Sequence, residues 1–126
     1  MTPLLKFPKV QFGFGVIKTL PAELTEIGIS RPLYITDQGL VRCGVFSTMR
    51  QGISAKAKST VFDETPENPT VEGVERALSA YRAGDCDGIV AVGGGSVIDT
   101  AKAVSLLAGH SESLAYYHNH PEKITL

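Results

Sequence analysis

Short apolar runs alternate with amphipathic stretches along this chain, which is typical of an α/β fold with a mainly parallel sheet. Short runs that contain apolar and β-branched residues occupy 32–36, 58–62 and 88–92. The third run is apolar throughout, as expected for a parallel strand that is buried on both faces. We therefore predict three strands at these positions.

Apolar residues at helical spacing fill the intervals between the strands. Pro21 suits a first helical turn, and Gly28 suits a helix end. Thr70 is expected to cap its helix, because its hydroxyl can accept a hydrogen bond from an unpaired backbone N–H. The four predicted helices run from Leu20 to Gly28, from about 40 to 51, from Thr70 through Tyr81, and from 97 to 108.

The two ends of the chain have weaker patterns. Residues 6–14 alternate weakly and lead into Phe12-Gly13-Phe14-Gly15, which predicts a strand or hairpin entering a glycine loop. After Gly109 the sequence is polar and irregular, and only a loop and a short strand at 124–126 are predicted.

The resulting β-α-β-α-β order predicts one Rossmann-like α/β domain over residues 1–126, with helices flanking a mainly parallel sheet. Right-handed crossovers place the carboxyl ends of all three strands at one edge of the sheet. Open α/β sheets bind ligands at that edge, so the candidate functional residues are expected to gather there.

Composition narrows the possible classes of function. The 126 residues include 12 basic and 13 acidic side chains, which leaves no basic surplus for binding nucleic acid. No run approaches the roughly 20 apolar residues that span a membrane. The N-terminus lacks the pattern of a signal peptide, so we expect a cytoplasmic protein. Cys43 and Cys86 match no metal-ligand spacing, and both are expected to be reduced and structural.

The turn Gly93-Gly94-Gly95-Ser96 is the most informative stretch of the sequence, because it joins an apolar strand directly to a helix. Unpaired N–H groups at such a helix start suit a phosphate or pyrophosphate, and glycine lets the ligand approach the backbone closely. Ser96 is interpreted as the N-cap, with Asp99 completing a capping box. The alternative is that the glycines only form a tight turn and the two polar residues only cap the helix.

Asp37 follows the predicted strand 32–36, at the expected ligand edge. A carboxylate there can accept hydrogen bonds from the ribose hydroxyls of an adenosine and would repel a 2′-phosphate. This favours NAD over NADP. The alternative is a solvated or helix-capping aspartate, and the sequence leaves the two interpretations about equally supported.

The decapeptide 93–102 resembles the nucleotide-binding signature of the iron-containing (group III) alcohol dehydrogenases. Three weaker matches, at residues 12–15, 35–40 and 67–70, fall in the order expected for that family. The resemblance covers about residues 5–110 and identifies 1–126 as an N-terminal dinucleotide-binding domain. Related glycerol dehydrogenases and dehydroquinate synthases share this architecture, so the substrate does not follow from these matches.

The resemblance also implies roles for individual residues. The glycine turn from Gly93 to Gly95, with Ser96 and Asp99, would hold the pyrophosphate, and Asp37 would bind the adenosine ribose. Asn68 would lie near the cofactor. The implied activity is hydride transfer between a small alcohol or aldehyde and the nicotinamide, by a protein that is expected to form homo-oligomers.

Members of this family continue into a further cofactor-binding strand and an all-helical domain that carries the catalytic Fe²⁺ or Zn²⁺. We therefore expect the present chain to be truncated, inactive alone, and without catalytic or metal-binding residues of its own. His110, His118 and His120 are interpreted as members of a solvated loop. A non-catalytic nucleotide-binding or interaction module is the alternative function.

Overall fold

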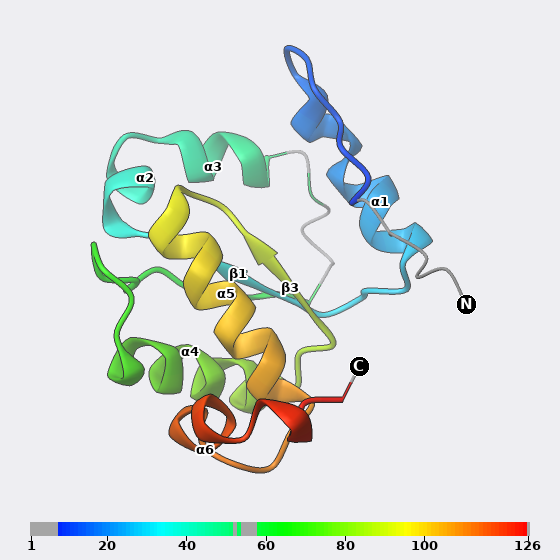
Figure 1. Ribbon diagram of the computed structural model, residues 1–126. Helices are drawn as coiled ribbons and strands as arrows, with labels where there is room; N and C mark the ends of the chain where they lie inside the picture. The colour runs from blue at the N-terminus through cyan, green and yellow to red at the C-terminus, as the bar shows by residue number, and fades with distance from the viewer. Residues whose placement is uncertain (1–7, 52, 54–57, 126) are drawn as a thin grey trace.

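The computed structural model of the chain describes residues 8–51, 53 and 58–125, which form a parallel sheet between two layers of helices (Figure 1). The strands β1 (Pro32–Ile35), β2 (Thr60–Phe62) and β3 (Gly88–Ala91) lie in the order β2-β1-β3. Leu33 of the central strand is in register with Thr60 on one side and Ile89 on the other. The prediction of an α/β fold with a parallel sheet is confirmed.

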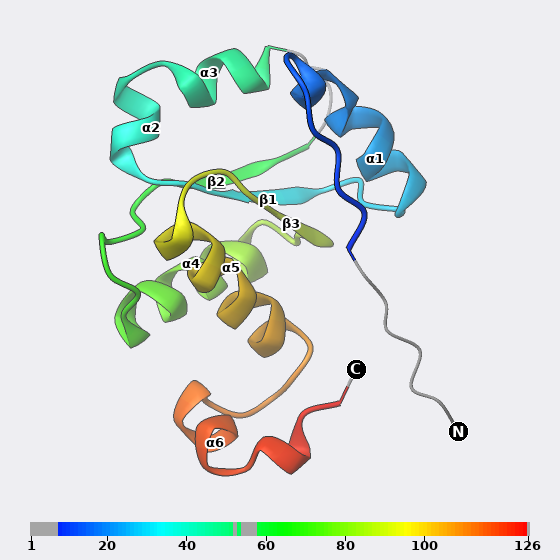
Figure 2. The same cartoon turned by 45° about the horizontal axis from the view of Figure 1, so that its top comes forward.

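Two groups of helices cover the two faces of this sheet, as Figure 2 shows. One face carries the early helices and the other carries the late ones. The early group comprises η1 (Val16–Thr19), α1 (Leu20–Glu26), α2 (Gln38–Arg42) and α3 (Val45–Arg50). In the late group, α4 (Val71–Ala83) and α5 (Gly95–Ala108) cover the sheet, and α6 (Leu114–Asn119) and η2 (Pro121–Lys123) lie beyond α5, away from the sheet. No helix among the described residues has both the length and the apolar character needed to cross a membrane.

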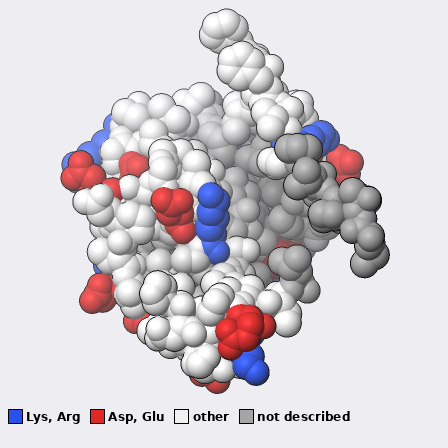
Figure 3. Space-filling view, in the orientation of Figure 1, with Lys and Arg blue, Asp and Glu red and all other residues white. Residues whose placement is uncertain are grey.

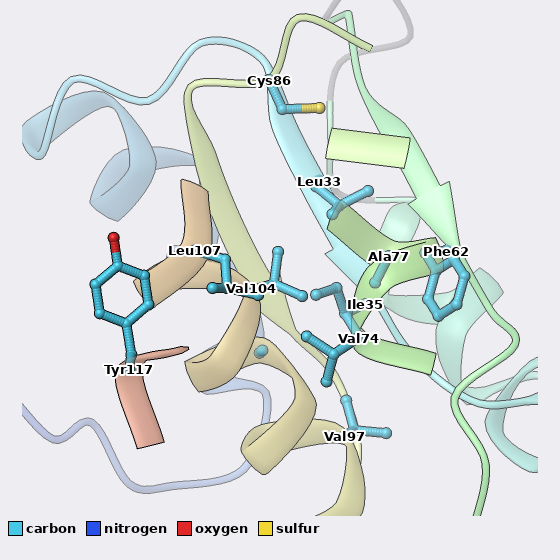
Figure 4. Close-up of a cluster of buried hydrophobic side chains, with 11 residues drawn as sticks. Leu33, Ile35, Phe62, Val74, Ala77, Cys86, Val97, Val104, Leu107 and Tyr117 are labelled. Carbon is cyan, nitrogen blue, oxygen red and sulfur yellow. The ribbon is translucent and has the colours of Figure 1, made fainter. Parts of the chain in front are cut away.

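The alternation of side chains along β1 divides the hydrophobic core into two clusters. Leu33 and Ile35 point toward α4 and α5, where they share a cluster with Val104 and Leu107 of α5 (Figure 4). Tyr34 points to the opposite face, where it meets Phe46 and Met49 of α3. The central strand is fully buried, whereas β3 lies at the edge of the sheet and is only half-buried. The prediction that the 88–92 strand is buried on both faces is therefore wrong for this chain.

Three predicted elements need correction. The helix expected at 40–51 is two helices, because Gly44 adopts the left-handed conformation with φ 82° and breaks the backbone hydrogen-bond pattern between them. Residues 8–14 form no strand or hairpin, and residues 6 and 7 lie outside the described chain. No strand is found at 124–125, and Leu126 also lies outside the described residues.

The segment after Gly109, predicted to be a loop, contains the short helix α6. Its start is capped by Ser113, whose hydroxyl accepts a hydrogen bond from the Tyr116 N–H at 3.2 Å. His110 fastens this region to the end of α5: Nδ1 donates to the Leu106 carbonyl at 2.6 Å, and Nε2 accepts from the Thr125 N–H at 3.1 Å. A six-residue helix is too short for its apolar spacing to be recognised in the sequence.

Asp87 connects the chain entering β1 to the chain entering β3. Its carboxylate accepts hydrogen bonds from the backbone N–H groups of Ser30 and Arg31, at 3.0 and 2.7 Å, and from the Ser30 hydroxyl at 2.9 Å. The two backbone bonds, from Ser30 first and then Arg31, hold the pKa of Asp87 below its usual value of 3.8. A depressed folded-state pKa means that ionised Asp87 stabilises the fold above the unfolded-state pKa.

We expect Asp87→Asn to lower the free energy of unfolding at pH 7. The difference from the wild type should disappear as the pH falls below 3.8 and through the lower folded-state pKa. Urea unfolding at pH 7 and at acidic pH would measure it, with Asp99→Asn, an exposed carboxylate on α5, as the control. An equal loss of stability at both pH values would show that the charge of Asp87 does not contribute.

Candidate functional site

The loops that follow β1, β2 and β3 surround a cavity of about 420 Å³ at the carboxyl edge of the sheet. A buried hydroxyl helps to fix this edge: Thr36 Oγ1 donates to the Val92 carbonyl at 2.8 Å, so the ends of β1 and β3 are tied together. Each loop contributes a short run of residues to the cavity wall. These runs are Asp37–Gly39, Thr65–Glu67 and Gly94–Val97.

The first turn of α5 forms one wall of the cavity. The helix begins at Gly95, and Gly94 is its N-cap without any side-chain capping bond. The backbone N–H groups of a first helical turn are unpaired within the helix and carry the positive end of its dipole. This wall can therefore bind an anion such as a phosphate or pyrophosphate.

The three consecutive glycines serve two different purposes. A Cβ atom on Gly93 would lie 2.6 Å from Cγ2 of the buried Val97, so the fold itself requires glycine there. A Cβ atom on Gly94 or Gly95 would meet nothing within 4 Å. The fold therefore does not require glycine at these two positions, and their bare backbone faces open space where a ligand could approach.

Ser96 and Asp99 do not form the predicted capping box, because the helix begins at Gly95, two residues earlier than the sequence suggested. Ser96 lies inside the first turn, and its hydroxyl donates to the backbone carbonyl of Glu67. This bond fastens the loop after β2 to the start of α5. Asp99 is exposed and does not line the cavity.

Asp37 lies opposite α5, on the loop that follows β1. Its side chain caps α2, because Oδ1 accepts a hydrogen bond from the Leu40 N–H at 2.9 Å. The same half-buried side chain lines the cavity. Capping engages one carboxylate oxygen, so the two interpretations considered for Asp37 are compatible with each other.

Asn68 is exposed and is not among the residues that line the cavity. Its neighbours Thr65, Pro66 and Glu67 form that wall instead. These three residues were not predicted as site residues, although they follow β2 in the same way that Asp37 follows β1, and although Glu67 belongs to the matched segment 67–70. The position of a loop after a strand was the available signal.

The cavity continues as a cleft along the sheet edge. Asp37, Gly39 and Gly94 also line a second hollow of about 490 Å³, which extends to Val45 and Val92. Those two valines line a third hollow of about 420 Å³, whose other walls include Ile17, Cys43 and Met49. The cleft is thus polar beside α5 and apolar beside α3. Figure 3 shows only scattered charged side chains on the face that it presents, without a broad basic patch.

The described residues include no group of three or more His, Cys, Asp or Glu side chains that could hold a metal ion. His110 is engaged by Leu106 and Thr125, and His120 lies 3.4 Å from a carboxylate oxygen of Glu122. The residues described here therefore do not fit a catalytic metal centre, which usually needs three protein ligands.

The two cysteines differ in exposure, and their reactivity is expected to differ accordingly. Cys43 is exposed and lines the apolar end of the cleft, whereas Cys86 is buried in the core. We expect iodoacetamide to modify Cys43 in the folded chain and to reach Cys86 only after unfolding. Mass spectrometry of peptides from native and urea-treated samples would test this, and equal labelling of both thiols in the native chain would contradict it.

Comparison with known proteins identifies relatives of this chain. The family model for iron-containing alcohol dehydrogenases matches residues 8–125. The chain is 44% identical over 108 residues to 4-hydroxybutyrate dehydrogenase of Cupriavidus necator, covering 86% of this chain and 28% of that protein. It is 35% identical over 109 residues to choline dehydrogenase of Bacillus subtilis, covering 86% and 27% respectively.

Solved structures show the same similarity in three dimensions. Sulfoacetaldehyde reductase of Bifidobacterium kashiwanohense, crystallised in complex with NAD⁺, superposes with a TM-score of 0.77 and 29% identity over 85% of this chain and 28% of that one. A 1,3-propanediol oxidoreductase superposes with a TM-score of 0.78 and 29% identity, over 83% and 28%. The chain thus spans less than a third of the length of these relatives. By its sequence over residues 8–125 and by its fold, the chain belongs to the iron-containing alcohol dehydrogenase family.

Proposed function

We propose that this chain is the dinucleotide-binding part of an NAD-dependent dehydrogenase that interconverts alcohols and aldehydes or ketones. The observation that carries the proposal is the open backbone of Gly94 and Gly95 at the start of α5, facing Asp37 across a cavity. The named relatives are dehydrogenases and reductases, which favours an enzyme over a non-catalytic module.

In this proposal the residues of the cavity bind and orient the cofactor. The N–H groups at the start of α5 donate to the pyrophosphate, while the missing side chains of Gly94 and Gly95 let it approach closely. The Asp37 carboxylate accepts hydrogen bonds from the adenosine ribose hydroxyls, which favours NAD over NADP. Ser96 acts indirectly, by fastening the Thr65–Glu67 wall to α5. Asp99 and Asn68 do not line the cavity, so the proposal assigns them no direct contact with the cofactor.

The cofactor supplies the hydride chemistry when it is bound, and the protein supplies position and electrostatics. Among the described residues, no group of three or more His, Cys, Asp or Glu side chains could hold a metal ion. The proposal for the described residues is therefore limited to binding and orienting the cofactor.

Titration of the chain with NADH, followed by the fluorescence of the reduced nicotinamide, tests the proposal. Saturable binding of NADH, competed by NAD⁺ and by ADP-ribose, is the expected result. The same titration on the urea-unfolded chain is the control for nonspecific binding. A folded chain that shows no saturable binding would contradict the proposed function.

A further inference from the structure

Two carboxylates line the candidate cofactor cavity, although only one of them was suspected from the sequence. Asp37 comes from the loop after β1 and Glu67 from the loop after β2, and no lysine, arginine or histidine lines the cavity with them. Within the described chain, neither carboxylate has a basic group within 4.0 Å. Among the described residues, no basic side chain therefore forms an ion pair with either carboxylate.

Glu67 is held in place through its backbone. The Ser96 hydroxyl donates to its carbonyl oxygen, and Thr65, two residues earlier, is buried. The residue is therefore fixed against the first turn of α5, where the proposed pyrophosphate site lies. The Glu67 residue is exposed, and no described residue forms a hydrogen bond with its carboxylate, so the charge acts through partly screening solvent.

The electrostatic consequence depends on the charge of the ligand. The start of α5 offers positive potential to the pyrophosphate that NAD and NADP share. A 2′-phosphate adds a further charge of about −1.5 to −2 near the ribose. At physiological ionic strength the Debye length is about 8 Å, so carboxylates lining the same cavity still act on that phosphate.

We propose that Glu67 is a specificity-determining residue that acts together with Asp37 to exclude 2′-phosphorylated dinucleotides. This inference rests on the proposed function, because it assumes that the cavity binds the dinucleotide. The proposal predicts that the selectivity for NADH over NADPH is shared between the loop after β1 and the loop after β2. Replacing Asp37 alone then relaxes the discrimination against NADPH only in part.

Glu67→Gln is a cleaner probe of this charge than any change at Asp37, because the Asp37 side chain also caps α2. The same loop provides a matched control in Glu64, which is ion-paired with Arg76 and does not line the cavity. Glu64→Gln removes the same charge from the same loop, at a position that does not line the candidate cavity.

The experiment titrates NADH and NADPH into the full chain as wild type, Glu67→Gln, Glu64→Gln, and the double variant Asp37→Asn with Glu67→Gln. Glu67→Gln is expected to lower the ratio of NADH to NADPH affinity about fivefold at low salt, as expected for removing one partly screened charge pair. Glu64→Gln should leave the ratio unchanged, and the double variant should lower it further. The effect of Glu67→Gln should shrink at high salt, which a purely structural change would not produce.

An unchanged affinity ratio in Glu67→Gln, beside normal NADH binding by the wild type, would overturn the role of Glu67 alone. A change of the same size in Glu64→Gln would also overturn it, because the effect would then follow the net charge of the loop. A wild-type chain that binds neither dinucleotide would refute the proposed function, and the inference with it.

Discussion

Alanine at Gly94 or Gly95 is expected to weaken NADH binding by tenfold or more while leaving the domain folded, whereas alanine at Gly93 is expected to destabilise the fold itself. A Cβ at either of the first two positions meets nothing within 4 Å in the chain, so only a bound ligand would collide with it. A Cβ at Gly93 would approach Cγ2 of Val97 to 2.6 Å, and Val97 is only 1% exposed and has no room to move. Such overpacking costs about 1–3 kcal/mol.

Urea unfolding and NADH titration of the three single variants separate these effects. Gly93→Ala should lower the unfolding midpoint, while Gly94→Ala and Gly95→Ala should unfold like the wild type. Gly109→Ala is a suitable control, since a Cβ there also meets nothing within 4 Å and the position lies at the opposite end of α5. Unimpaired NADH binding in both Gly94→Ala and Gly95→Ala would show that the ligand does not approach the backbone at this turn.

Leu107→Ala is expected to cost about 2–5 kcal/mol of stability, the range for truncating a buried leucine. Leu107 is 2% exposed and lies in the cluster that joins α4 and α5 to the sheet (Figure 4). A domain of this size is stabilised by only about 5–15 kcal/mol, so the variant should be close to unfolding. Because α5 also carries the glycine turn, apparent NADH affinity should fall together with the folded fraction.

Leu106→Ala provides the matched comparison, since the same side chain is truncated one residue earlier on the same helix. Leu106 is only partly buried against the cluster, so its loss should cost less than half as much. Guanidinium unfolding of the two variants under one set of conditions would measure the difference. Equal losses would mean that the face of α5 turned toward the sheet differs from the one described.

The parts of the fold that depend on local chemistry were predictable. The strand at 32–36 and the helix after Thr70 were identified because apolar periodicity and capping act within a few residues. The division of the 40–51 helix at Gly44 was missed, since apolar spacing continues across the break. The short helix α6 was missed because six residues are too few to show a period.

The candidate site also contains features that were predictable from the sequence and features that were not. Glycines after an apolar strand indicated an anion site, and the position of Asp37 after another strand indicated the opposite wall. Both expectations used only chain order. The loop residues that complete the cavity wall could not be inferred from the sequence, because their identity depends on how the loop after β2 packs against α5. The hydrogen bond between Ser96 and Glu67 holds this loop in place, and the two residues are 29 positions apart in the sequence.

The α/β order and the family could be predicted from the sequence, because strand and helix patterns and the glycine-rich motif at 93–102 are local. The handedness of parallel crossovers then indicated the sheet edge where a ligand is expected. The different surroundings of the three glycines, and the pair of carboxylates that line one cavity, became visible only in the folded chain. The tertiary structure separated Gly93, which Val97 leaves no space to replace, from Gly94 and Gly95, which face the cavity. It also brought Glu67 to the same cavity as Asp37, because contacts between distant segments depend on packing that no local pattern encodes.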